Sequence, residues 1–247
     1  MPPDVRAWPG VSPIERVEGG HRNEVWRGTS PNGQVAIRSS RRSSESLAWE
    51  LDLVERLGAL GFLVPRVAPT ADGEPEAGGV VVQEWIEGRE PSTIADWRLV
   101  AAELCRLHVV MSGHPQRPGC VPVAELDRRS RSVDADLAAL PDDVAAEVLA
   151  VFASISDEPT SLVHGDPGPS NLRITADGRV VLLDWDESRV DVALHDLSNL
   201  GIRVLPDDDH ARAQRLSDAW EVANAWLVEP EYARWRLDRL RRADHHG

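Results

Sequence analysis

Apolar and polar residues alternate differently before and after residue 88, so the chain is expected to contain two unequal parts. Before residue 88, short apolar runs bounded by turn residues predict four strands, at residues 14–18, 24–28, 34–38 and 80–86. One stretch with helical spacing separates the last two strands. The first part is therefore expected to be a small sheet with one helix.

Local signals set the ends of these elements. Asn32-Gly33 lies between two predicted strands and is a strong hairpin signal. Ser43 or Ser44 can cap the helix, because a serine side chain accepts a hydrogen bond from a free amide of the first turn. Gly61 is expected to end the helix. The apolar residues of the helix recur at helical spacing, at Leu47, Leu51, Val54 and Leu57.

From residue 89 onward the pattern becomes mainly helical. Helices are predicted over most of the chain after residue 192 and over three earlier segments, residues 95–111, 133–139 and 142–153. Short strands are predicted at residues 161–163, 172–174 and 179–183. The second part is therefore expected to be a helical unit with a few short strands.

Polar residues at the ends of the short strands are the clearest chemical signal in the chain. Residues 164–166 read His-Gly-Asp, Asn171 follows five positions after Asp166, and a later strand leads into Asp-Trp-Asp at residues 184–186. Carboxylate and amide oxygens suit Mg²⁺. Their order matches a phosphoryl-transfer pattern of a His-x-Asp loop, an Asn and a metal-binding Asp. The loop alone also fits a surface turn, but the three elements together favour phosphoryl transfer.

These motifs resemble those of the aminoglycoside phosphotransferase and choline kinase family, and the resemblance covers about residues 13–240. The resemblance implies an α+β, protein-kinase-like two-lobe fold. It places a small antiparallel-sheet nucleotide-binding lobe at residues 1–87 and a larger, mainly helical catalytic and substrate-binding lobe at residues 88–247. It also implies that the protein is a phosphotransferase with an alcohol group as acceptor, and that ATP and Mg²⁺ are its cofactors.

The resemblance also assigns roles to residues of the second part. Asp166 is expected to orient and partly deprotonate the substrate hydroxyl, while Asn171 and Asp184 are expected to hold Mg²⁺. Asp186 is a weaker candidate for the metal site. His164 is expected to brace the loop, although a general base beside Asp166 is the alternative. Asp196 matches a structural aspartate of the family.

In the first part, the resemblance indicates five nucleotide-binding residues. Glu50 on the helix is expected to pair with Arg38 on a strand, and this arginine would engage the phosphates; the alternative is a surface arginine and an unrelated glutamate. Gly20 lies where a phosphate-covering loop is expected, although that loop lacks the full Gly-x-Gly-x-x-Gly pattern and also fits a plain hairpin turn. Residues 83–85, which include Gln83 and Trp85, are the expected hinge, whose backbone would pair with adenine; any buried strand that leads into a linker has a similar sequence.

The composition narrows the chemistry. All 27 basic residues are arginine, so chemistry that needs a lysine amine, and a Walker A loop, are excluded, while phosphate binding by a guanidinium such as that of Arg38 is not. The net charge of −14 makes nucleic acids and anionic membranes poor partners. Residues 89–247 hold 28 acidic residues and 18 arginines, which suits a cationic acceptor; the alternative is an acidic surface that serves solubility alone.

Three functions are compatible with these observations. The first is an ATP-dependent kinase for an aminoglycoside-like or other antibiotic or natural product, and hence a role in antibiotic resistance. The second is a metabolic kinase for an amino alcohol, sugar or nucleoside. The third is a nucleotide-binding pseudokinase with a regulatory role, which the joint presence of Asp166, Asn171 and Asp184 disfavours. GTP is an alternative to ATP because hinge contacts use the backbone.

The sequence also predicts a cytoplasmic location. No signal peptide and no uncharged apolar run of 18 residues is evident. The two cysteines, Cys105 and Cys120, lack the spacing of a zinc site and do not form a disulfide framework. Cys105 is expected to pack within its helix rather than act as a nucleophile. Helical packing is likewise the expected role of Trp220, Trp226 and Trp235, with the lining of a substrate pocket as the alternative. The oligomeric state is not indicated.

Overall fold

The computed structural model describes residues 1–17, 24–198, 200 and 202–244, and the chain divides into two compact units. The first unit contains Met1–Glu90 and Ser170–Asp186. The second contains Pro91–Pro169 and Glu187–Gly247. The main division thus lies three residues after the sequence-based boundary at 87/88, and the hairpin segment after residue 169 belongs with the first unit.

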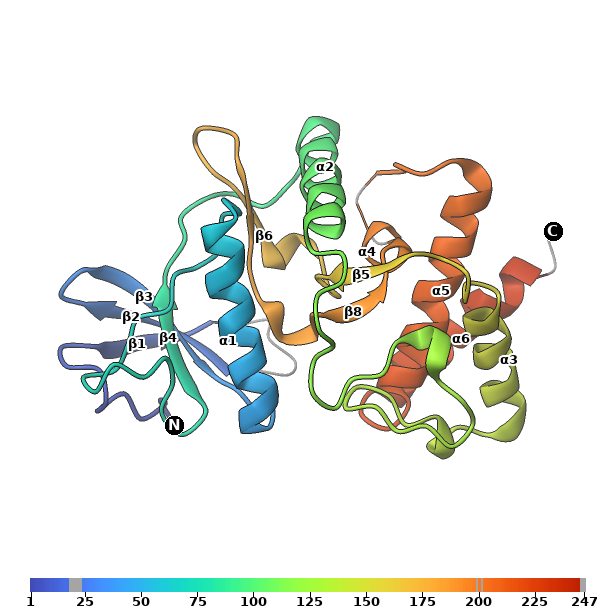
Figure 1. The fold of residues 1–247 in the computed structure, drawn as a ribbon, viewed down its shortest axis with the longest axis horizontal. Coiled ribbons are helices and arrows are strands. Elements are labelled where there is room, and N and C mark those ends of the chain that lie inside the picture. Colours follow the sequence, from blue (N-terminus) through green and yellow to red (C-terminus); the bar gives the residue numbers. More distant parts are fainter. Residues whose placement is uncertain (18–23, 199, 201, 245–247) are drawn as a thin grey trace. The chain divides into compact units, whose positions relative to one another are not determined.

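The first unit is built on a four-stranded antiparallel sheet with the strand order β1-β2-β3-β4 (Figure 1). These strands are β1 (Ser12–Arg16), β2 (Glu24–Ser30), β3 (Gly33–Ser39) and β4 (Val80–Glu84), and α1 (Ser44–Ala59) lies between the last two in the chain. All four predicted strands and the predicted helix are therefore confirmed, with ends that shift by one or two residues.

The two faces of this sheet bury different partners. Val80 and Val82 belong to one apolar cluster with Trp8 of the N-terminal segment. Val81, which points to the other face because side chains alternate along a strand, belongs to a second cluster with Leu47 of α1. The helix therefore covers one face of the sheet.

The hairpin of β6 (Leu172–Ile174) and β7 (Val180–Leu182) is tied to the first unit by backbone bonds. Leu182 N donates to Leu63 O at 3.0 Å, and Ile174 exchanges two hydrogen bonds with Arg89, at 3.1 and 2.7 Å. These bonds explain why a segment from late in the chain belongs to the first unit.

The second unit is mainly helical. Its α-helices are α2 (Ile94–Val110), α3 (Asp142–Ala153), α4 (Leu194–Leu197), α5 (Asp207–Ala225) and α6 (Pro230–Asp244). Its strands β5 (Thr160–Val163) and β8 (Arg189–Val192) form an antiparallel pair. Single 3₁₀ turns in the chain lie at Val123–Glu125, Leu137–Ala139, Pro169–Asn171 and Trp185–Glu187. Within the described ranges, no helix is both long and apolar enough to cross a membrane.

Three local predictions in the second unit were wrong. Residues 133–139 form an irregular segment ending in a short 3₁₀ turn rather than a helix, because the Asp136 carboxylate accepts from the Ala138 amide and so competes with helical bonding. Strand β8 was missed because its inward residues are Arg189 and Asp191, which pair with each other at 2.8 Å. Cys105 is exposed and does not pack in the core.

The tryptophans of the C-terminal helices differ in burial. Trp220 is 1% exposed and packs in the core as predicted, and Trp226 packs against the same cluster. Trp235 is 49% exposed, stacks on Tyr232 at 5.9 Å, and does not fill a core position. The packing prediction therefore fails for Trp235.

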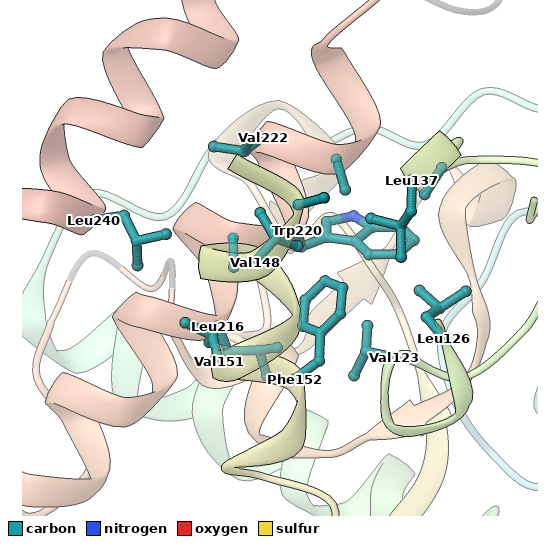
Figure 2. Close-up of a cluster of buried hydrophobic side chains, with 14 of the residues drawn as sticks. Val123, Leu126, Leu137, Val148, Val151, Phe152, Leu216, Trp220, Val222 and Leu240 are labelled. Carbon is teal, nitrogen blue, oxygen red and sulfur yellow. The ribbon is translucent and has the colours of Figure 1, made fainter. Parts of the chain in front are cut away.

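The core of the second unit joins α3 to the C-terminal helices (Figure 2). Phe152 of α3 is 1% exposed and lies in one cluster with Trp220 of α5. Other labelled members come from the same helices and from the preceding loops, among them Val123, Leu126, Val148, Val151 and Leu216.

Phe152→Ala should lower the free energy of unfolding by about 3–5 kcal/mol, because it removes a buried ring and leaves a cavity. Urea unfolding followed by tryptophan fluorescence would measure the loss. Leu227→Ala is the matched control, since Leu227 is 68% exposed and its truncation should cost about 0.5 kcal/mol or less. Equal losses in the two variants would contradict this account of the core.

Candidate active site

An ion pair between Arg38 and Glu50 is the centre of the candidate site in the first unit. Arg38 on β3 pairs in register with Val81 on β4, so both side chains point to the face of the sheet that α1 covers. Arg38 Nη2 donates a hydrogen bond to Glu50 Oε1 on that helix. The two residues are 4% and 2% exposed, so the predicted pair forms in a buried environment.

Two further carboxylates face the same guanidinium. Arg38 Nη1 lies 3.8 Å from Asp184 Oδ1 and 3.6 Å from Asp186 Oδ1. Burial by itself would lower the pKa of Arg38, but the carboxylates of Glu50, Asp184 and Asp186 outweigh burial and raise that pKa above its ordinary value. Arg38 is therefore permanently charged, and its guanidinium faces three carboxylates.

A cavity opens beside this ion pair. Its polar lining comes from Arg38, Glu50, Gln83 and Asp184, and its apolar lining from Leu51, Val54, Pro65, Val67 and Trp185. Its volume of about 10 Å³ has room for about one water molecule, so it is a small gap beside the ion pair and not a pocket of ligand size. Within the described part of the first unit, four of the sequence-predicted site residues thus line one space.

Asn171 and Asp184 lie beyond the same end of the β6–β7 hairpin. Leu172 pairs with Leu182, and Leu183 N donates to the backbone oxygen of Asn171 at 2.9 Å. Asp184 has φ +50°, a left-handed conformation that costs a non-glycine residue about 1 kcal/mol. The side chain of Asp184 is 38% exposed, so the carboxylate remains partly accessible.

The expected hinge has fewer free backbone donors than the sequence suggests. The amide of Glu84 donates to Arg66 O at 2.8 Å, and the amide of Trp85 donates to Gln34 O at 3.2 Å. Gln83 pairs with Ala36 in the sheet and lines the cavity. Backbone pairing with a base would therefore need carbonyl groups of this segment or the residues that follow it.

In the second unit, Asp196 organises the His-Gly-Asp loop. Its carboxylate accepts from the backbone amides of His164 and Gly165, at 2.8 and 2.9 Å, and lies 2.9 Å from His108 Nε2 on α2. Burial alone would raise the pKa of Asp196, but the hydrogen bond from His108 and its other partners lower it to about 2. Asp196 is therefore an ionised anchor, in agreement with the expected structural role.

The loop itself leaves little freedom around Asp166. Gly165 has φ +91°, and a Cβ there would lie 2.4 Å from the backbone oxygen of Glu187. His164 is fully buried, and its Nδ1 lies 3.4 Å from the amide nitrogen of Asp166. Asp166 is exposed. The carboxylate of Asp166 is thus exposed on a loop whose backbone is held on the N-terminal side of Asp166.

Behind the loop, His195 occupies a buried cationic environment. It is 3% exposed, its ring meets Trp220 edge-on at 5.8 Å, and Arg189 stacks on that tryptophan at 3.8 Å. Burial, followed by the charge of Arg189, lowers the pKa of His195 to about 4. His195 is therefore neutral at physiological pH.

Some of the predicted site residues lie together in the first unit and others do not. The side chains of Arg38, Glu50, Gln83 and Asp184 line one cavity in the first unit. Trp85 does not line this cavity, and the guanidinium of Arg27 lies over its ring at 5.2 Å. Gly20 lies outside the described residues. Sequence reasoning missed Arg42 and His108, because neither falls in a motif and their partners are distant in the chain.

The sheet with its strand cation and helix glutamate, together with the helical unit that carries a His-Gly-Asp loop, defines a protein-kinase-like fold, as predicted. The chain belongs to the phosphotransferase enzyme family, whose model matches residues 13–237. The predictions that it resembles this family and that it is a phosphotransferase are confirmed at that level. A comparison with the curated proteins finds no match.

Solved structures support the fold. Choline kinase LicA from Streptococcus pneumoniae has a TM-score of 0.63 and 18% identity, and the match covers 93% of this chain and 94% of that one. A thermostable mutant of aminoglycoside phosphotransferase APH(4)-Ia has a TM-score of 0.66 and 15% identity, with 94% of each chain covered. A microcompartment-associated aminopropanol kinase has a TM-score of 0.63 and 17% identity, with 96% and 92% covered.

The buried His195 should make the protein less stable in mild acid. Because its folded pKa of about 4 lies below the unfolded value, the unfolded chain takes up the proton first, and stability falls as pH drops below about 6.5. His195 should lower the free energy of unfolding by about 2 kcal/mol when the pH falls from 7.5 to 5.0. Urea unfolding at both pH values should show that His195→Phe loses less stability than the wild type. An unchanged pH dependence in the variant would contradict this.

Proposed function

We propose that the protein is a small-molecule kinase that transfers the γ-phosphate of ATP to a hydroxyl group of an amine-bearing acceptor. The observation that carries the proposal is the buried Arg38–Glu50 pair, with the partly exposed Asp184 carboxylate 3.8 Å from the same guanidinium. A fixed cation next to an accessible carboxylate suits the binding of nucleotide phosphates together with a metal ion.

The residues of the first unit fit Mg²⁺ by the chemistry of their donors. Asn171 supplies an amide and Asp184 a partly exposed carboxylate, and both follow the same end of one hairpin. In the described part of the chain, no three histidine, cysteine or acidic side chains converge as a metal site. A set of one carboxylate and one amide suits an ion that takes its other ligands from phosphate and water. When bound, Mg²⁺ would neutralise phosphate charge.

Arg38 would hold the nucleotide phosphates. Its Nη2 is committed to Glu50, so the pair fixes the direction of the guanidinium before any ligand arrives. A guanidinium keeps its charge at any working pH, and catalysis of phosphoryl transfer rests mainly on positioning and charge neutralisation. The same role in most kinases of this type would fall to a lysine, which this chain lacks.

Asp166 would align the acceptor hydroxyl and take its proton. Its carboxylate is exposed, whereas His164 in the same loop is fully buried and is therefore the poorer candidate for a general base. Asp196 fixes the backbone on the N-terminal side of Asp166 through two amide hydrogen bonds. Such a rigid support favours a group that must hold a hydroxyl in line with a phosphorus atom.

The charge of the chain favours an acceptor with a positive charge. Residues 89–247 carry 28 acidic residues and 18 arginines. The structural neighbours include kinases named for choline, aminopropanol and aminoglycosides, all of which carry amine or ammonium groups. An aminoglycoside-like antibiotic or natural product is our first candidate, and a metabolic amino alcohol is the second.

An assay of nucleoside diphosphate formation, ADP from ATP or GDP from GTP, tests the proposal directly. The purified protein would be given MgATP or MgGTP with a panel of aminoglycosides, other antibiotics, amino alcohols, sugars and nucleosides. We expect ADP formation that depends on at least one amine-bearing acceptor and on Mg²⁺. Nucleotide binding without turnover on any acceptor would favour the regulatory pseudokinase instead.

Asp166→Asn should lower kcat by about two to four orders of magnitude, because it removes the proton acceptor and keeps the shape of the side chain. The affinity for MgATP, measured by calorimetry, should stay within about threefold, since Asp166 is not expected to touch the nucleotide. Arg38→Ala is the contrasting variant and should weaken nucleotide binding. Near-normal turnover in Asp166→Asn would refute the assignment of the base.

A further inference from the structure

The two acids of the Asp-Trp-Asp segment lie in different environments. The side chain of Asp184 is 38% exposed, whereas that of Asp186 is 6% exposed. The sequence offers both acids for the metal site, with Asp186 as the weaker candidate. The structure separates them, because one carboxylate remains accessible and the other is enclosed by protein.

Arg42 encloses Asp186. Its Nε lies 3.3 Å from both carboxylate oxygens, and its Nη2 donates to Oδ2 at 3.0 Å and to the backbone oxygen of Asp186 at 2.7 Å. The side chain of Arg42 is itself only 7% exposed. A planar guanidinium that binds both carboxylate oxygens and the adjacent carbonyl fixes the position and orientation of the acid.

Asp186 also faces a second cation. Arg38 Nη1 lies 3.6 Å from Asp186 Oδ1, so two guanidinium groups approach one carboxylate. A divalent ion bound to that carboxylate would lie close to two positive charges, which repel it. If the ion displaced the two guanidinium groups, buried arginines would lose their acidic partner. In contrast, the Oδ1 of Asp184 faces Arg38, while the Asp184 side chain as a whole is 38% exposed.

We propose that Asp186 is not a metal ligand but a positioning residue, held by Arg42, that keeps Arg38 and the segment around Asp184 in place. The inference rests on the proposed function, since it divides the two acids of the proposed metal site into one ligand and one anchor. Arg42, from the loop before α1, thereby becomes part of the machinery of the site.

Metal binding distinguishes the two acids without any measurement of turnover. Binding of Mn²⁺ in the presence of ADP would be followed by electron paramagnetic resonance on the full-length protein. Asp184→Asn should weaken Mn²⁺ binding about tenfold or more, and Asp186→Asn should change it by less than about threefold. A loss in Asp186→Asn as large as that in Asp184→Asn would overturn the inference.

A double-mutant cycle tests the pairing of Arg42 with Asp186 by thermal unfolding. Arg42→Gln and Asp186→Asn should each lower Tm by about 6 °C or more. The Tm of the double variant should lie close to that of the less stable single variant, because both substitutions remove the same interaction. Arg41→Gln is the matched control, because Arg41 is the exposed neighbour in the same loop and its loss should leave Tm nearly unchanged. Additive losses in the cycle would overturn the inference.

The two experiments also separate this inference from the proposed function. If both Asp184→Asn and Asp186→Asn bind Mn²⁺ normally, the metal assignment of the proposed function fails, and with it the division of the acids into ligand and anchor. If only Asp184→Asn loses the metal and the cycle shows coupling, both stand. If Asp186→Asn loses the metal while Asp184→Asn also does, the proposed site stands and the anchor role is refuted.

Discussion

The arrangement of the first unit depends on one buried cation. The guanidinium of Arg38 donates to Glu50 on α1 and faces two carboxylates that follow the β6–β7 hairpin. Three segments that are distant in the sequence therefore share one charge. Burying a charge is unfavourable unless it is paired, so the sheet, the helix and the hairpin end must be correctly assembled for this arginine to be tolerated.

In the second unit, the main structural requirement is to fix the position of an exposed acid, Asp166. Asp166 lies on a loop, and loops are the more mobile parts of proteins. Asp196 compensates, because its buried carboxylate accepts two consecutive amides just before Asp166 and is itself held by His108. Rigidity is thus supplied by a charged hydrogen-bond acceptor beneath the loop rather than by apolar packing around Asp166.

Local signals in the sequence predict most of the elements and part of the site. The serine cap and apolar spacing place α1 within a residue, since Ser43 accepts from the Ser46 amide as expected. The pairing of Arg38 with Glu50 follows from the family resemblance, which places a strand cation beside a glutamate of the first helix. The failures have separate causes. Strand β8 was missed because it buries an Arg189–Asp191 pair, so a pattern that looks polar lies inside the unit. The helix expected at residues 133–139 does not form because the Asp136 carboxylate accepts from the Ala138 amide.

Contacts between distant segments could not be predicted in this way. Arg42 and Asp186 are 144 positions apart, and nothing in either local sequence indicates the partner. The same holds for His108 and Asp196, 88 positions apart, because a histidine in an apolar helix is compatible with ordinary packing. Such pairs are fixed only when the chain is folded, and they involve long-range charge compensation rather than local propensity.

The geometry of Arg38 explains how a chain without lysine can form the strand cation of a kinase-like site. A guanidinium has several donors in a fixed plane, so Nη2 can bind Glu50 while Nη1 faces Asp184 and Asp186. An ammonium is a compact point charge and could not address the two sides separately from the same backbone position. A composition without lysine is therefore compatible with a kinase-like site, provided that the acids around the strand cation are distributed over both arms of an arginine. In this chain they are, with Glu50 on one side and the Asp-Trp-Asp segment on the other.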